Sequence, residues 1–423
     1  MAYQETKTVG YGSRVGSSFR GIGSGFLLFV AGTALLWWNE GRVVKTDKML
    51  NEAEAKTEEL TTIDRIDPEM DGRLVYATGL ATTEDSLSDP TYGIGAKAIR
   101  LTRQVEYYQV QESAHQESKD KLGGKEEITT TYSYSEGWWP TPVQSSQFHD
   151  PAYQKKNFVL TTADNAVWQA ENVAFGAFQL SQTQVGSIRG DEPVDLSLLL
   201  DSALLVRLNK EAQQVIQRQY GGKSDSMKLV HVAQNQLYFG FSPSSPAVGD
   251  VRITFTKTMP AKVTIIARQT GNTFTSFKAK NGKTFQTLVM GTRAADEIYE
   301  GAHSSNHTLM WILRLLGIML IISGLKGIFA FIETILKVIP FVANIIGWGV
   351  GVVCTVIGLA WSLIIIAIAW LFYRPLIGIA LLAVAGALIW VFALKGKDKL
   401  KEMAAKYNQP KVAPEPSQMP ANV

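Results

Sequence analysis

The sequence contains a single cysteine and no large excess of either positive or negative charge. Its single cysteine, Cys354, cannot form an intramolecular disulfide, so any folded domain must be held together by burial. The 41 Lys and Arg residues nearly offset the 38 Asp and Glu residues, which leaves a net charge of +3 over 423 residues. This balance provides no basic surface for nucleic acid, and nucleic acid is not expected as a partner.

Recognisable catalytic motifs are also lacking. There is no G-x-S-x-G elbow, no P-loop and no dinucleotide fingerprint preceded by a strand. The closest histidines, His303 and His307, lie four residues apart without the glutamate of an HExxH motif, and His115, His149 and His231 stand alone. The sequence therefore predicts a protein that is not an enzyme, with no catalytic residues, no metal and no cofactor. An active site assembled from distant Asp and Glu residues is the alternative.

Long apolar runs are present, but only near the two ends. One covers 22–38, and a denser block covers 309–394, interrupted at 333–340 and 373–375. Each piece is long enough to cross a hydrocarbon core of about 30 Å. The predicted organisation is a disordered tail (1–19), a first membrane helix (20–38), a large polar domain (39–308), a second helix (309–332), a loop (333–340), a third helix (341–372), a tight outer turn (373–375), a fourth helix (376–394) and a basic, proline-containing tail (395–423).

Basic residues near the membrane helices predict the orientation. The C-terminal flank is Lys-rich, and the N-terminal tail, which four passes place on the same side, is also basic. Both tails are therefore expected in the cytoplasm, with the large domain and the 373–375 turn outside it. Arg42, Lys45 and Lys48 argue weakly for the reverse.

The polar domain has the patterns of an α+β fold rich in antiparallel sheet. Apolar and polar residues alternate over 251–256 and 263–267, which is typical of half-buried strands. Asn281-Gly282 predicts a tight hairpin turn. Helices are predicted at 198–219, ended by Gly221-Gly222, and at 294–300, where the helix leads almost directly into the second span.

Two sets of residues are candidates for functional contacts. Aromatic and basic side chains near the ends of the spans are typical of membrane-interface or lipid contacts: Trp37, Trp38, Arg42, Trp311, Arg314, Lys326 and Arg374. For Arg314 and Lys326, interhelical pairing is the alternative to anchoring. Small residues favour close helix packing, within one chain or between protomers: Gly347, Gly351, Gly358, Gly378 and Gly386.

Several short motifs together resemble one family. They are Trp38-Asn39-Glu40-Gly41-Arg42, Arg103-Gln104-Val105-Glu106, Thr131-Tyr132-Ser133-Tyr134, Val248-Gly249-Asp250-Val251-Arg252, Thr264 to Gln269, Trp311 with Arg314, and Trp370 to Leu376. In order and spacing they are similar to the LUMA family, also called transmembrane protein forty-three. The resemblance implies a four-pass protein with a large loop outside the cytoplasm. In animal members it implies residence in the endoplasmic reticulum and inner nuclear membrane, oligomerisation, and association with emerin and lamins.

The resulting hypothesis is a non-enzymatic membrane scaffold that forms homo-oligomers and organises lipids or other membrane proteins. The alternative is a lipid-handling or channel-forming assembly, based on apolar clusters at Trp138-Trp139-Pro140 and Phe175 to Phe178. The sequon Asn306-His307-Thr308 would be pressed against the membrane. A sequon at this position does not suit glycosylation, and a single cysteine cannot form a disulfide. Both observations favour a bacterial inner membrane over an organelle membrane.

Overall fold

The chain forms two compact units. The computed structural model describes residues 3–221, 226–336 and 340–373, with isolated positions 379, 383, 384, 386, 387 and 390. One unit comprises Met1–Tyr11 and Lys45–His307, and the other comprises Gly12–Val44 and Thr308–Val423. The first unit is rich in β-strands and the second is helical. The α+β expectation for 39–308 agrees with the β-rich unit.

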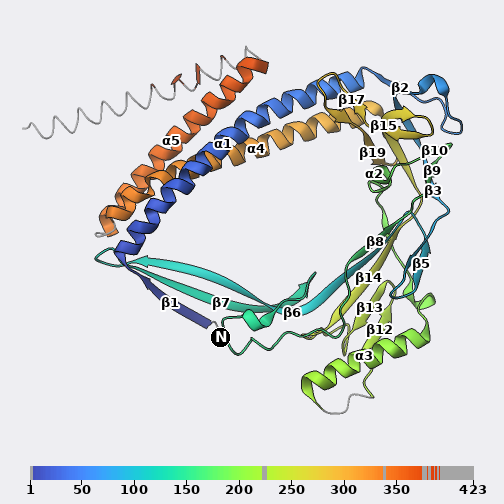
Figure 1. Ribbon diagram of the computed structural model, residues 1–423, viewed down its shortest axis with the longest axis horizontal. Coiled ribbons are helices and arrows are strands. Elements are labelled where there is room, and N and C mark those ends of the chain that lie inside the picture. Colours follow the sequence, from blue (N-terminus) through green and yellow to red (C-terminus); the bar gives the residue numbers. More distant parts are fainter. Residues whose placement is uncertain are drawn as a thin grey trace, which may run out of the picture. The chain divides into compact units, whose positions relative to one another are not determined.

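The larger sheet of the β-rich unit is antiparallel and has the order β1-β7-β6-β14-β13-β12, with β8 paired to β6 and β11 paired to β14 (Figure 1). Its strands are β1 (Tyr3–Val9), β6 (Arg100–Asp120), β7 (Glu126–Trp139), β8 (Ala166–Gln169), β11 (Asp191–Pro193), β12 (Val230–Ala233), β13 (Gln236–Phe239) and β14 (Val251–Thr258). Alternation predicted β14, and its inward residues Val251, Ile253 and Phe255 are fully buried.

The second sheet closes on itself. Its order is β19-β15-β16-β10-β9-β3-β2, and a further pairing of β15 with β3 completes a ring of five strands around a core that includes Phe175 and Phe274. Its strands are β2 (Thr57–Glu59), β3 (Leu74–Thr83), β9 (Val173–Phe175), β10 (Phe178–Gln179), β15 (Ala261–Thr270), β16 (Thr273–Thr275) and β19 (Thr287–Met290).

Two short hairpins complete the strands: β4 (Ser86–Asp89) with β5 (Ile94–Lys97), and β17 (Phe277–Lys278) with β18 (Thr284–Phe285). The predicted turn at Asn281-Gly282 joins the second pair, and Gly282 has φ of +80°. Single helical turns occur at α2 (Gln182–Val185) and in the 3-10 segments η1 (Pro68–Met70), η2 (Ser145–Gln147) and η3 (Leu196–Leu198).

Helix α3 (Ser202–Tyr220) packs on the β12 end of the larger sheet (Figure 1). Its apolar face, Leu208, Ala212 and Ile216, is buried against that sheet. The Asp201 side chain accepts a hydrogen bond from the backbone N–H of Ala203, and Gly221 ends the helix with φ of +71°. The sequence-based helix at 198–219 is therefore confirmed, with its start shifted by an aspartate cap.

The long helices α1 (Tyr11–Glu54) and α4 (Ala295–Leu336) extend well past the apolar runs. Within the β-rich unit, Met49 and Leu50 of α1 share a core with Tyr299 of α4 and with Leu74 and Ile266. The predicted short helix at 294–300 is the first part of α4 and has no break before the second apolar run. Each helix thus continues without interruption from an apolar run into a folded core.

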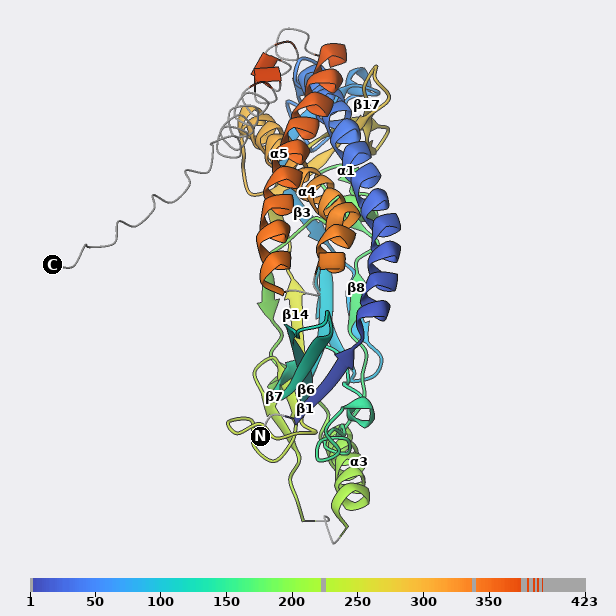
Figure 2. The ribbon, with the colours of Figure 1, turned by 90° about the vertical axis from the view of Figure 1, so that its left-hand side faces the viewer.

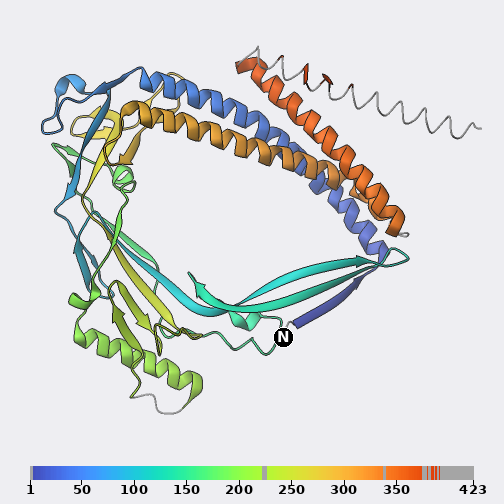
Figure 3. The same ribbon diagram turned by 180° about the vertical axis from the view of Figure 1, so that it is seen from behind.

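The N-terminal residues differ from the prediction. We expected a disordered tail at 1–19, but residues 3–9 form β1, and α1 starts at Tyr11. β1 is paired along its whole length with residues Glu126–Tyr132 of β7 (Figure 3). Peptide groups cannot pair through a bilayer. This pairing is therefore incompatible with the predicted placement of the tail and the domain on opposite membrane faces.

The helical unit contains parts of α1 and α4 and the whole of α5 (Pro340–Tyr373), which run alongside one another (Figure 2). Among the described residues, these three helices are long and apolar enough to cross a membrane. The bounds of α5 lie one residue outside the predicted 341–372 span at each end. The predicted fourth span and the C-terminal tail lie outside the continuously described residues.

Candidate functional site: a buried glutamate–arginine pair among apolar helices

Glycines bring α1 and α4 together within the helical unit. A Cβ on Gly25 would lie 2.7 Å from the carbonyl oxygen of Gly324, and one on Gly32 would lie 2.8 Å from that of Gly317. The two glycines on each helix are seven residues apart, which is about two turns. The backbones therefore touch at matching positions. We call these four glycines the glycine seam.

Glu40 of α1 and Arg314 of α4 form an ion pair on the same two helices. Arg314 Nε donates to Glu40 Oε1 at 2.6 Å, and Nη2 donates to Oε2 at 2.7 Å. Glu40 is fully buried and Arg314 is 8 % exposed. A bidentate pair of this geometry can offset the large cost of removing two charges from water, provided that neither partner is removed.

Aromatic side chains enclose this pair. The Arg314 guanidinium lies 4.9 Å from the ring centre of Trp311 and 5.3 Å from that of Trp370 on α5. The Trp370 indole N–H donates to Glu40 Oε2. A guanidinium this close to two tryptophan rings gains cation–π attraction that a lysine at this position would not reproduce. The pair therefore joins α1, α4 and α5.

Neighbouring residues of α1 extend these contacts. The Asn39 amide donates to the Met310 carbonyl oxygen at 3.1 Å, and Arg42 donates to Asn39 Oδ1 at 3.3 Å. At Gly41, a Cβ would lie 3.0 Å from the Tyr373 hydroxyl. We name Asn39, Glu40, Arg314 and Trp370 the clamp. Their polar atoms hold helices together, and the arrangement presents neither a nucleophile nor an exposed acid.

The structure places the predicted interface residues as follows. Trp38 and Trp311 are 57 % and 64 % exposed, and Trp37 packs edge-on against Phe372 with ring centres 5.8 Å apart. Lys326 is exposed on α4. Arg314 makes the interhelical pair that was one of its two expected roles. Lipid contact for this group stays a prediction, and Arg374 lies outside the described residues.

The glycines predicted for helix packing make fewer close helix contacts in the described residues than the glycine seam does. A Cβ on Gly358 would lie 2.7 Å from Ile322 of α4, whereas around Gly351 and Gly386 no described atom lies within 4 Å of that position. Gly378, and the surroundings of Gly347, lie outside the described residues. Sequence reasoning missed the glycine seam and the role of Glu40. The seven-residue spacing in both helices was the signal that could have found the seam.

A second polar cluster lies where α1 and α4 enter the β-rich unit. Asn306 donates to Asp47 Oδ1 at 2.8 Å, and His303 Nδ1 and His307 Nε2 lie 3.4 and 3.8 Å from the same carboxylate. The paired histidines of the sequence thus face a buried aspartate. Across the described ranges, no three His, Cys, Asp or Glu side chains are arranged to hold a metal ion.

Motif residues of the β-rich unit also pair with one another. Arg252 Nε donates to Glu106 Oε2 at 2.6 Å between the neighbouring strands β14 and β6, and Arg103 forms a buried pair with Asp89 at 2.7 Å. The Arg252 guanidinium also lies 4.3 Å from the ring centre of Trp138. These charges are used in structural contacts within the β-rich unit.

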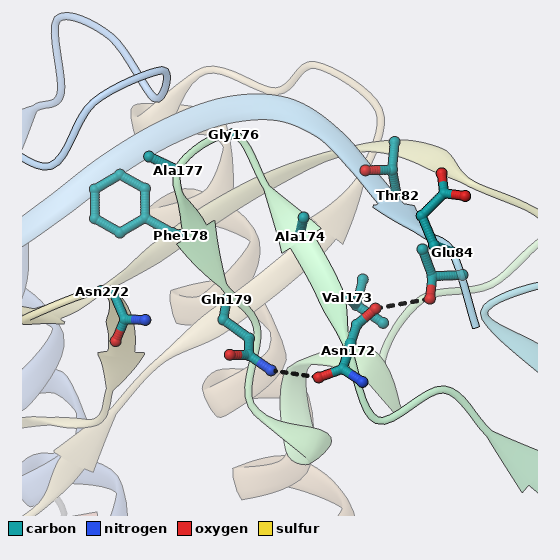
Figure 4. A pocket seen from close by; sticks show the side chains of 11 residues that line it. Thr82, Glu84, Asn172, Val173, Ala174, Gly176, Ala177, Phe178, Gln179 and Asn272 are labelled. Atoms are coloured by element: carbon teal, nitrogen blue, oxygen red, sulfur yellow. Dashed lines mark hydrogen bonds between the residues drawn. The ribbon is translucent and has the colours of Figure 1, made fainter.

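A shallow pocket of about 370 Å³ lies over β9 and β10 (Figure 4). Its polar groups bind one another: Thr83 donates to the Asn172 carbonyl at 2.7 Å, and Gln179 donates to the Asn172 side chain at 3.2 Å. Phe175 and Phe178 are no more than 1 % exposed. They belong to the core and do not form the exposed apolar patch on which the lipid-handling alternative partly rested.

One cluster in the β-rich unit makes stability depend on pH. Glu112 accepts from the Tyr134 hydroxyl at 2.6 Å and from the His149 backbone N–H at 2.7 Å. Burial alone would raise the pKa of Glu112, but these hydrogen bonds and the His149 ring outweigh it, so the pKa lies below its usual value. Burial and the bond to Glu112 raise the pKa of Tyr134 to about 12.

Because the folded-state pKa of Glu112 is lowered, its contribution to stability is complete above the ordinary carboxyl pKa and is lost as the pH falls through the folded value. We expect hydrogen-exchange protection of residues 145–157 to fall in that acidic range in the wild type. In Glu112→Gln, protection should already be reduced at pH 7 and should change little with acid. Glu117→Gln, on the same strand with an exposed side chain, is the control. Equal pH profiles for all three proteins would contradict the assignment.

The arrangement defines a class of protein: an integral membrane protein whose apolar helices are held by a glycine seam and a buried ion pair and continue into a β-rich unit. A family model described as Transmembrane protein 43 matches residues 107–375, more than half of the chain. The chain belongs to this family, which confirms the LUMA resemblance.

The curated relatives agree with this assignment. The chain is 29 % identical over 378 residues to Transmembrane protein 43 of Rattus norvegicus and of Homo sapiens, covering 87 % of this chain and 88 % of each relative. It is 26 % identical to the Drosophila melanogaster homolog over 387 residues, covering 87 % and 92 % of the two chains. No solved structure matches it.

Proposed function

We propose that this protein is a non-enzymatic membrane scaffold that forms homo-oligomers and holds other membrane proteins or lipids in place. The observation that carries the proposal is the convergence of family motifs in the clamp. The motif around Glu40, the Trp311 and Arg314 pair, and the motif that begins at Trp370 lie far apart in sequence, and their residues meet at one ion pair. What these motifs build is a rigid helix junction.

The continuous helices support the same proposal. Side chains near the end of α1 and the start of α4 are buried in the core of the β-rich unit. Both helices therefore contribute to a packed core, which suits a protein that presents a fixed surface. In the proposed arrangement α1, α4, α5 and 376–394 lie within the membrane. A bacterial inner membrane is the favoured location.

Native mass spectrometry of the protein in lipid nanodiscs tests this function. We expect a defined oligomer without stoichiometric lipid. A monomer in nanodiscs, together with no crosslinked species in native membranes, would contradict the scaffold.

One observation favours lipid handling as the second candidate. An apolar groove of about 380 Å³ lies between α1 and α5, lined by Phe29, Val30, Thr33, Ala34, Trp37 and Ile365. If the groove holds an acyl chain, the nanodisc particle should retain stoichiometric lipid, and Ala34→Trp should remove it by filling the groove. Retention of equal lipid by both proteins would exclude this groove as the lipid site.

A further inference from the structure

A groove lies between α3 and β12 in the β-rich unit, away from the clamp. It has a volume of about 690 Å³, and its walls are the 205–213 stretch of α3 and residues 228, 230 and 232. On the helix side, Val206 is 70 % exposed although its side chain is apolar. We call this surface the α3 groove.

An open sheet edge runs along the α3 groove. Among the described strands, β12 is the last of the larger sheet and pairs only with β13. The Gly240 N–H donates to the Leu229 carbonyl oxygen at 2.7 Å, which sets the alternation of this antiparallel ladder. The peptide groups of His231 therefore face β13, and those of Val232 face the open edge.

Both ends of this edge are already closed. The Val230 N–H donates to Asn209 Oδ1 of α3 at 3.1 Å. The Leu196 N–H donates to the Gln234 carbonyl oxygen at 2.7 Å. Between these two bonds, the N–H and C=O of Val232 have no partner in the part of the chain that the structure describes. One donor and one acceptor at a fixed place define a single register for an added strand.

The charges beside this edge are positive. Lys210 on α3 and Lys228 just before β12 are both exposed. Neither lysine has an ion-pair partner among the described residues, and no Asp or Glu lines the groove. The α3 groove is therefore complementary to a negatively charged ligand and would repel a basic one.

We propose that the α3 groove binds an extended acidic segment of another protein. The segment adds to β12 as a short strand, exchanges main-chain hydrogen bonds with Val232, and places its carboxylates beside Lys210 and Lys228. Its apolar side chains cover Val206. The inference rests on the proposed scaffold function, and it gives the β-rich unit a surface for holding a partner.

A labelled peptide tests this binding on the full-length protein in phosphatidylcholine nanodiscs. Fluorescence anisotropy with Glu-Glu-Val-Val-Glu-Glu should show saturable binding with a Kd of about 10 to 100 μM. The peptide Lys-Lys-Val-Val-Lys-Lys should bind at least about tenfold more weakly. Methylation of the two valine amides of the acidic peptide removes main-chain donors without changing its charge, and should also weaken binding about tenfold.

Variants of the protein test the same contacts from the other side. Val232→Pro removes only the outward N–H of β12, which an edge position tolerates, and should weaken binding about tenfold. Val232→Thr keeps that N–H and is the matched control. Lys210→Glu with Lys228→Glu should reverse the preference between the two peptides. Lys262→Glu, at an exposed position of β15, should leave it unchanged.

Other outcomes would overturn distinct claims. No saturable binding, equal binding of the acidic and basic peptides, or full binding of the methylated peptide would end the inference on the unaltered protein. Displacement of the acidic peptide by phosphatidylglycerol vesicles would assign the lysines to an anionic lipid surface instead. A protein that is oligomeric in nanodiscs but binds no peptide would lose only this inference, whereas a monomer that binds the peptide would lose the scaffold function.

Discussion

Replacing Arg314 by methionine is expected to lower the free energy of unfolding by about 3 to 5 kcal/mol, because it leaves the fully buried Glu40 carboxylate without its charged partner. The Trp370 indole would remain as a donor, but a neutral donor cannot offset a buried charge. Thermal unfolding of the detergent-solubilised protein, followed by circular dichroism, measures the change.

Two further variants make this result specific. Arg207→Met removes one partner of an exposed pair with Glu211, 3.8 Å away on α3, and should cost less than about 1 kcal/mol. The double variant Glu40→Met with Arg314→Met should recover most of the lost stability, since apolar side chains of similar volume can replace a buried pair. The ion pair would not be important for stability if Arg314→Met behaved like Arg207→Met.

Replacing Gly25 by leucine is expected to separate α1 from α4. Its Cβ would lie 2.7 Å from both the Gly324 carbonyl oxygen and the Ile328 nitrogen, and these backbone atoms can move only if a helix moves. Overpacking of this kind costs about 1 to 3 kcal/mol. It also removes the close backbone contact that holds apolar helices together in a membrane. We expect a lower unfolding temperature and a smaller oligomeric fraction in nanodiscs.

Gly23→Leu is the matched control for this variant. Gly23 lies on the same helix, two residues away, and no described atom lies within 4 Å of the position of its Cβ. The added side chain should change the unfolding temperature little. If Gly23→Leu and Gly25→Leu destabilise the protein equally, the cost comes from the loss of glycine in α1 and not from the seam.

The clamp explains why a sequence with few polar residues in its apolar helices can still hold a defined register. Glycine contacts and dispersion between apolar side chains favour close approach but distinguish poorly between helix positions one turn apart. A bidentate pair between Glu40 and Arg314 is satisfied in one register only, because a shift by one turn would leave both charges buried and unpaired. Specificity of this kind suits a protein whose proposed role is to present a fixed surface.

The sequence alone determined the features that depend on local pattern. Uniform apolarity over 22–38 and 341–372 is sufficient to predict long helices, because hydrophobicity on all sides requires burial in protein or lipid. Alternation predicted β14 and β15, Asn281-Gly282 predicted a hairpin turn, and periodic leucines ended by glycine predicted α3. The joint order of short motifs was enough to identify the family.

Only the tertiary structure decided which distant residues meet. Glu40 and Arg314 are 274 positions apart, so no local pattern could pair them, and the sequence favoured an anchor at the membrane surface as the role of Arg314. Residues 3–9 have no apolar alternation of their own and form a strand only because β7 supplies its hydrogen-bonding edge. Likewise, the glycines at 25 and 324 become a contact only when two helices cross there. Local sequence fixes the elements through propensity and hydrophobic period, whereas pairing between elements depends on long-range packing.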